Sequence, residues 1–120
     1  FTYIDDLVQG MRLLMDAIPD NTNLPEEMLG KIDSKSKVAP FRVVNIGNSK
    51  PSKLLDFIVA IEDSIGIEAV KNLMPIQAGD VPATWADTML LHELTGYKPN
   101  MEISTGVQNF VTWYRDYYDI

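Results

Sequence analysis

The stretch FRVVNIGNSKPSKLLDFIVAIEDSIG, residues 41–66, decides the expected fold because a strand pattern is followed there by a helix pattern. Residues 41–46 are rich in β-branched side chains and lie between a proline and a glycine, which is typical of a strand. A helix should follow, with Pro51 near its first turn and Gly66 as its C-terminal stop. The apolar face of this helix should consist of Leu54, Leu55, Ile58, Ile61 and Ile65.

A second extended run at residues 69–76 gives the order strand, helix, strand, which predicts a right-handed parallel crossover. Flanking helices are expected over 4–18, after Asp87 with a stop at Gly96, and from Ser104 onward. The predicted class is therefore mixed α/β, with a short parallel β pair, a crossover helix and flanking helices.

Length and composition predict one globular domain over residues 1–120. The chain is 46% hydrophobic and 22% charged, and no apolar run approaches the ~20 residues of a membrane span. Residues 19–40 are polar and rich in turn formers, so we expect a surface excursion within this domain. The acidic start does not resemble a signal peptide, and a chain that begins with Phe1 is expected to belong to a longer protein. A cytoplasmic location is expected.

Charge and residue content exclude several classes of site. The net charge is −7, with 17 acidic and 10 basic residues, which argues against a nucleic-acid partner. Without cysteine there is no thiol nucleophile or disulfide, and His92 is expected on a solvated helix face. Asp5 and Asp6 could suggest a metal site, but capping of a helix N-terminus explains the pair better. The aromatic residues 113–118 fit an end helix packing on a core better than a base-stacking platform.

The stretch IQAGDVPATWAD, residues 76–87, is the best candidate for ligand contact. Gln77 offers a donor and an acceptor, and the carboxylate of Asp80 can accept from two vicinal hydroxyl groups, as on a ribose. Gly79 would let the backbone approach a ligand closely. The alternative is a tight loop that leads into a helix capped by Asp87, and these residues do not decide between the two.

This stretch resembles part of a known family when it is taken together with four others. The chain resembles the C-terminal, substrate-binding part of the extended short-chain dehydrogenase/reductases. Within them it is most similar to the NAD-dependent nucleotide-sugar epimerases of the UDP-glucuronate 4-epimerase and capsule-biosynthesis type. The motifs occur in family order over essentially the whole chain, and they are FTYIDD at 1–6, FRVVNIG at 41–47, QAGDVPATWAD at 77–87, GYKP at 96–99 and FVTWYRDYY at 110–118.

The resemblance implies three substrate-binding residues and no catalytic or metal-binding ones. Asp80 matches the aspartate that holds the nucleotide ribose, and Gln77 matches a position that is a phosphate-contacting arginine in galactose-type epimerases. Phe1 matches an aromatic residue near the nucleotide. Ala78 departs from the pattern, because the UDP-glucuronate group commonly has a proline there.

The family's dinucleotide loop, G-x-x-G-x-x-G, and its catalytic Tyr-x-x-x-Lys do not occur in this sequence. The resemblance therefore implies that NAD is bound by a Rossmann domain missing from this chain, and that the chain by itself is inactive. In the parent enzyme, NAD would take a hydride from C4 of a UDP-sugar and return it to the other face, as a step in polysaccharide biosynthesis.

The expected partners are a UDP-sugar, of the UDP-glucuronate or UDP-galacturonate type, and the missing Rossmann domain. No membrane partner is expected. The isolated chain should self-associate through the apolar face that the Rossmann domain would cover. Two alternatives remain open: a nucleotide-sugar dehydratase or decarboxylase of the same superfamily, and a non-catalytic binding or interaction module.

Overall fold

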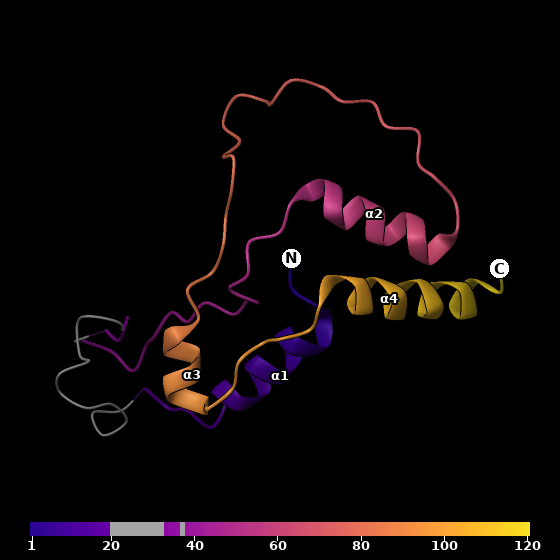
Figure 1. Cartoon of the computed structure of the whole chain (residues 1–120). Coiled ribbons are helices and arrows are strands. Elements are labelled where there is room, and N and C mark those ends of the chain that lie inside the picture. Colours follow the sequence, from indigo (N-terminus) through magenta and orange to yellow (C-terminus); the bar gives the residue numbers. More distant parts are fainter. Residues whose placement is uncertain (20–32, 37) are drawn as a thin grey trace. The chain divides into compact units, whose positions relative to one another are not determined.

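A computed structural model describes residues 1–19, 33–36 and 38–120. The described residues form four α-helices (Figure 1), which are α1 (Ile4–Leu14), α2 (Leu54–Ile65), α3 (Met89–Thr95) and α4 (Ile103–Tyr118).

The chain divides into two compact units. Unit 1 contains α2 and α4 and comprises Phe1, residues 50–84 and residues 101–120. Unit 2 contains α1 and α3 and comprises residues 2–49 and 85–100. The assignment of one domain to the whole chain stays a prediction.

In unit 1, α2 and α4 pack against each other and run in the same direction. Just before the two helices begin, Lys50 Nζ lies 2.6 Å from Glu102 Oε1. Near their ends, Arg115 Nη2 donates to the carbonyl of Ile65 over 2.9 Å, which satisfies an acceptor in the last turn of α2. The side of α4 that is buried carries small residues, namely Gly106, Val107 and Val111.

The helix boundaries agree well with the signals in the sequence. Gly66 and Gly96 end α2 and α3 in the left-handed conformation, with φ of 81° and 69°. Asp87 Oδ1 accepts the backbone N–H of Met89, the first residue of α3, over 2.9 Å, while the N-cap position is Thr88, whose side chain makes no capping hydrogen bond. The first helix is shorter than expected and ends at Leu14, before the predicted end at residue 18.

In unit 2, α1 and α3 pack together around Leu91, which is fully buried. The segment 41–47 lies against α1, because a Cβ added at Gly10 would sit 3.0 Å from Ile46 Cγ2. A Cβ added at Gly47 would sit 2.9 Å from the Cβ of Ala86, so only glycine fits between these segments. Close packing at two glycines thus fixes this part of the unit.

The predicted parallel β pair is absent, since the described ranges contain no β-strand. Residues 41–46 belong to unit 2 and residues 69–76 to unit 1, so the two runs do not form a common sheet. Phe41 instead accepts the backbone N–H of Ser36 through its carbonyl over 2.8 Å. The mixed α/β class is therefore not confirmed, and the described part of the chain is helical.

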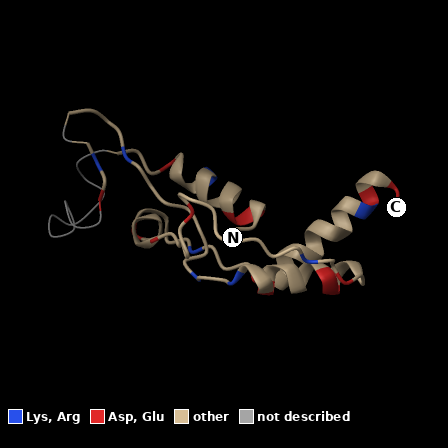
Figure 2. Cartoon of the chain, turned by 90° about the horizontal axis from the view of Figure 1, so that it is seen from above, with Lys and Arg blue, Asp and Glu red and all other residues tan. Residues whose placement is uncertain are grey.

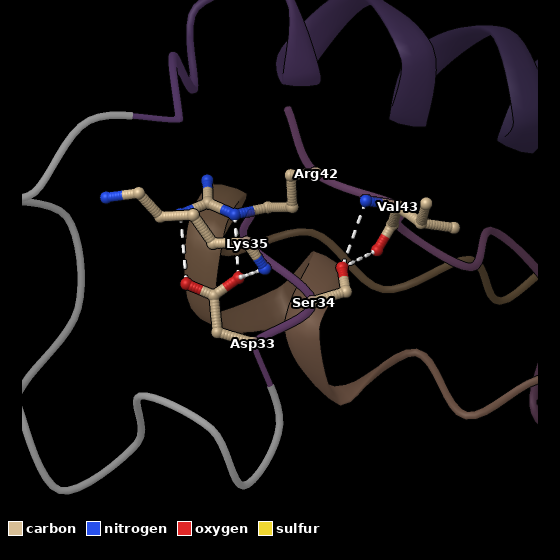
Figure 3. A network of polar contacts seen from close by, with 5 residues as sticks. All are labelled: Asp33, Ser34, Lys35, Arg42 and Val43. Atoms are coloured by element: carbon tan, nitrogen blue, oxygen red, sulfur yellow. Dashed lines mark hydrogen bonds and ion pairs between the residues drawn. The ribbon is translucent and has the colours of Figure 1, made fainter. Parts of the chain in front are cut away.

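An ion pair and a serine hold residues 33–36 to the 41–43 segment (Figure 3). Arg42 donates from Nε and Nη2 to the two carboxylate oxygens of Asp33 over 2.8 and 3.1 Å, and both side chains are almost fully buried. The Ser34 hydroxyl accepts the N–H of Val43 over 3.0 Å and donates to the carbonyl of the same residue. Residues 20–32 and 37 of the predicted surface excursion lie outside the described residues.

Candidate functional site

The stretch that the sequence analysis selected contains a β-turn at Gln77–Asp80 in unit 1. The N–H of Asp80 donates to the carbonyl of Gln77 over 3.1 Å, and Gly79 has a φ of +98°. Ala78 is not among the residues with positive φ, so the turn has the type II arrangement, in which the third position requires glycine. Gln77 and Asp80 are the first and last residues of this turn, and both are exposed. Their role in binding stays a prediction.

Phe1, the third predicted residue, also belongs to unit 1 although its neighbours in sequence belong to unit 2. Its ring stacks on Phe57 of α2 with centroids 4.2 Å apart and an angle of 5° between the planes. Among the described residues, no hydrogen bond or ring contact joins Phe1 to the 77–80 turn. Phe57 was not predicted from the sequence, where its only signal is an aromatic residue one helical turn after Leu54.

The segment that carries the turn is anchored to α2 by Glu62. The Glu62 carboxylate accepts the backbone N–H of Ala69 over 2.8 Å and pairs with the ammonium group of Lys71. The hydrogen bond from Lys71, followed by that from Ala69, holds the pKa of Glu62 below its ordinary value. The segment is thus held to α2 at Ala69 and Lys71, before it reaches the first candidate ligand-binding residue, Gln77.

In unit 2, Asp6 has a role other than the one expected. The cap of α1 is Tyr3, and no side-chain hydrogen bond is made there, although Asp5 and Asp6 do lie in the first helical turn. The buried carboxylate of Asp6 instead accepts the hydroxyl of Tyr97 over 2.6 Å and the backbone N–H of Asn100 over 3.1 Å. The expectation of a capping side chain is therefore wrong for Asp6, which ties α1 to the segment after α3.

This contact changes the ionisation of the tyrosine. Burial, and secondly the hydrogen bond to Asp6, raise the pKa of Tyr97 from 10.0 to about 12. A phenolate beside a carboxylate would lose the donated proton and gain a like-charge repulsion, which explains the direction.

The remaining candidates show no feature of a reactive centre. His92 is exposed on α3, as expected. Within residues 1–19, 33–36 and 38–120, no three acidic or histidine side chains are grouped so that they could hold a metal ion. In the same part of the chain, no helix has the length and apolar character needed to cross a membrane.

The aromatic end of α4 is more exposed than the sequence analysis expected. Val107 and Val111 are buried, but the aromatic residues Phe110 and Tyr114 of the same helix are 55% and 41% exposed. Figure 2 shows basic positions scattered along the described ribbon.

Comparison with known proteins shows similarity over the full chain. The chain is 47% identical over all of its length to an uncharacterized 37.6 kDa protein in the cld 5′ region of Escherichia coli O111:H-. Over 98% of its length it is 43% identical to a probable UDP-glucuronate 4-epimerase of Rhizobium meliloti and 43% identical to protein CapI of Staphylococcus aureus. No protein-family model matches the chain.

The chain spans about a third of these relatives, 35%, 34% and 35% of their respective lengths. It is also 37% identical to UDP-glucuronate 4-epimerase 4 of Arabidopsis thaliana, of which it spans 26%. The matched region is the C-terminal part in each case. The resemblance expected from the sequence is therefore confirmed: the chain is similar over nearly all of its length to the C-terminal part of proteins named UDP-glucuronate 4-epimerase and CapI.

Proposed function

We propose that this chain is the substrate-binding portion of a longer enzyme that interconverts UDP-glucuronate and UDP-galacturonate by inverting C4 of the sugar. The observation that carries the proposal is the 43% identity, over 98% of the chain, to a probable UDP-glucuronate 4-epimerase. A role in polysaccharide biosynthesis and a cytoplasmic location remain parts of the proposal that follow from the resemblance.

The chemistry of the 77–80 turn supports a grip on the nucleotide. An exposed carboxylate next to a glycine with positive φ can accept hydrogen bonds from both hydroxyl groups of a ribose while the backbone stays close to the ligand. The amide of Gln77 can donate to a phosphate oxygen but cannot neutralise its charge. Asp80 is therefore assigned the ribose, Gln77 the diphosphate, and Phe1 the neighbourhood of the base.

The residues of this chain do not fit a dinucleotide cofactor. A dinucleotide site needs a glycine-rich turn between a strand and a helix, and the described residues contain no strand while the sequence has no such glycine pattern. We therefore place NAD in a part of the longer protein outside these 120 residues. The contribution of this chain is to bind the nucleotide, which is remote from the reacting carbon, and the binding energy of this contact positions the sugar.

Substitution of Asp80 by alanine in the full-length protein tests the assignment. A lost hydrogen bond to a charged group is worth roughly 1.5–3 kcal/mol, so the Kd for UDP should rise by about one to two decades. Asp63→Ala is the matched control, because Asp63 is an exposed acidic residue of α2 in the same unit. Titration calorimetry with UDP measures both variants, and an unchanged Kd for Asp80→Ala would remove the ribose assignment.

A further inference from the structure

The stacked pair of Phe1 and Phe57 is closer and flatter than most aromatic contacts in proteins. Its centroids are 4.2 Å apart and its planes differ by 5°, whereas aromatic pairs usually have centroids 4.5–7 Å apart and are offset or tilted. Phe57 covers one face of the Phe1 ring, and 59% of Phe1 is still exposed. More than half of Phe1 is therefore accessible to solvent although Phe57 covers one face of its ring.

Phe57 is well placed to fix this ring. It lies in the first turn of α2, is half-buried, and donates its N–H to the carbonyl of Lys53 over 3.3 Å. Through the stack, Phe1 joins unit 1, which also contains the Gln77–Asp80 turn, while residues 2–49 belong to unit 2. A planar ring that is stacked on one face and is still more than half exposed is suited to stack on a flat ligand group.

We propose that Phe57 is a positioning residue for nucleotide recognition, which holds the Phe1 ring so that this ring stacks on the uracil base of a UDP-sugar. The inference rests on the proposed function and adds a residue to it. Every base has a π-face, and stacking of one base on an aromatic side chain is worth about 1–3 kcal/mol, or roughly 5- to 150-fold in affinity. Loss of the support from Phe57 would free the Phe1 ring to turn and would weaken this contact.

A purely structural role for the pair makes a different prediction. If the two rings only bury apolar surface, loss of Phe57 should lower stability and weaken every ligand of the site by the same factor. If Phe57 acts through the base, the loss should depend on whether the ligand carries a base. Ligands with and without uracil therefore separate the two roles.

The test uses the full-length protein and four forms of it: wild type, Phe57→Leu, Phe57→Trp and Asp80→Ala. Titration calorimetry measures the Kd of each form for UDP, which has a base, and for ribose 5-phosphate, which has none. Phe57→Leu should raise the Kd for UDP about tenfold and leave that for ribose 5-phosphate unchanged. Phe57→Trp, which keeps a flat ring at this position, should bind UDP within about threefold of wild type. Phe57→Leu should also raise KM for the UDP-sugar more than it lowers kcat, because the base is remote from C4.

Two results would overturn the inference. One is an unchanged Kd for UDP in Phe57→Leu, and the other is an equal loss for UDP and ribose 5-phosphate, which is the structural outcome. Asp80→Ala keeps the proposed function separately testable, because it should weaken both ligands. A protein in which Asp80→Ala weakens UDP but Phe57→Leu does not would retain the proposed function and lose only the role of Phe57.

Discussion

The hydroxyl of Tyr97 offers a sharp test of how unit 2 is held together. Tyr97→Phe removes one atom, the donor of the 2.6 Å hydrogen bond to Asp6, and leaves the ring in place. A hydrogen bond to a charged group contributes roughly 1.5–3 kcal/mol, and Asp6 keeps the N–H of Asn100 as a donor, so we expect a loss of about 1.5–2 kcal/mol near neutral pH. Tyr117→Phe is the matched control, since that residue is 68% exposed.

The pH dependence of the same variant tests the cause. Because the pKa of Tyr97 is raised from 10.0 to about 12 on folding, its contribution is fully present below pH 10 and is lost as the pH rises towards 12. A shift of one pKa unit corresponds to about 1.36 kcal/mol in the free energy of unfolding. Because the Tyr97 ring is only half-buried, contact with solvent makes its actual contribution smaller than the full pKa shift would give. The difference in stability between wild type and Tyr97→Phe should therefore shrink from pH 10 upward.

Urea unfolding followed by circular dichroism at several pH values between 7.5 and 11.5 measures this difference. The two proteins differ only at residue 97, so subtraction of one curve from the other isolates the contribution of the Tyr97 hydroxyl. Two results would refute the reasoning: a loss in Tyr97→Phe no larger than in Tyr117→Phe, or a difference that stays constant across the alkaline range.

Three further predictions concern unit 1 and the chain as a whole. Ala78→Pro should stabilise the turn by about 0.4–1 kcal/mol and tighten UDP binding. Gly79→Ala should cost about 1–2 kcal/mol because φ is +98°; the cost comes from the backbone alone, since no atom lies within 4 Å of the added Cβ. Equal unfolding midpoints in urea would contradict both expectations. The low pKa of Glu62 means that its contribution is present above pH 4.5 and is lost as pH falls through the lowered value, so Glu62→Gln should remove that acidic step from the chemical-shift titration of the Ala69 amide, and a step that persists would count against the anchor. The 120-residue chain should lack epimerase activity with added NAD and should self-associate in light scattering; turnover above background, or a monomer at high concentration, would disprove the respective statement.

The helices were predictable from sequence because a helix closes its hydrogen bonds within its own segment. The signals at Gly66, Gly96 and Asp87 are local: each glycine ends a helix as expected, and Asp87 accepts the N–H of the first residue of α3. The 77–80 turn was equally accessible, since Gly79 supplies the positive φ that the third position requires. What could not be predicted are pairings across long stretches of sequence, such as Asp6 with Tyr97 and Phe1 with Phe57.

The two strand predictions failed for the complementary reason. A run of β-branched residues states a preference for extended backbone, but a strand exists only where a neighbour accepts and donates hydrogen bonds along its edge. Residues 41–46 form no helix, and alternate side chains at Arg42, Val44 and Ile46 are half-buried as on one face of a strand. Their neighbours are α1 and residues 33–36, which supply a serine hydroxyl and single backbone bonds in place of a ladder. The period of two in the sequence thus reports which side chains face the core, and the presence of a sheet depends on residues elsewhere in the chain.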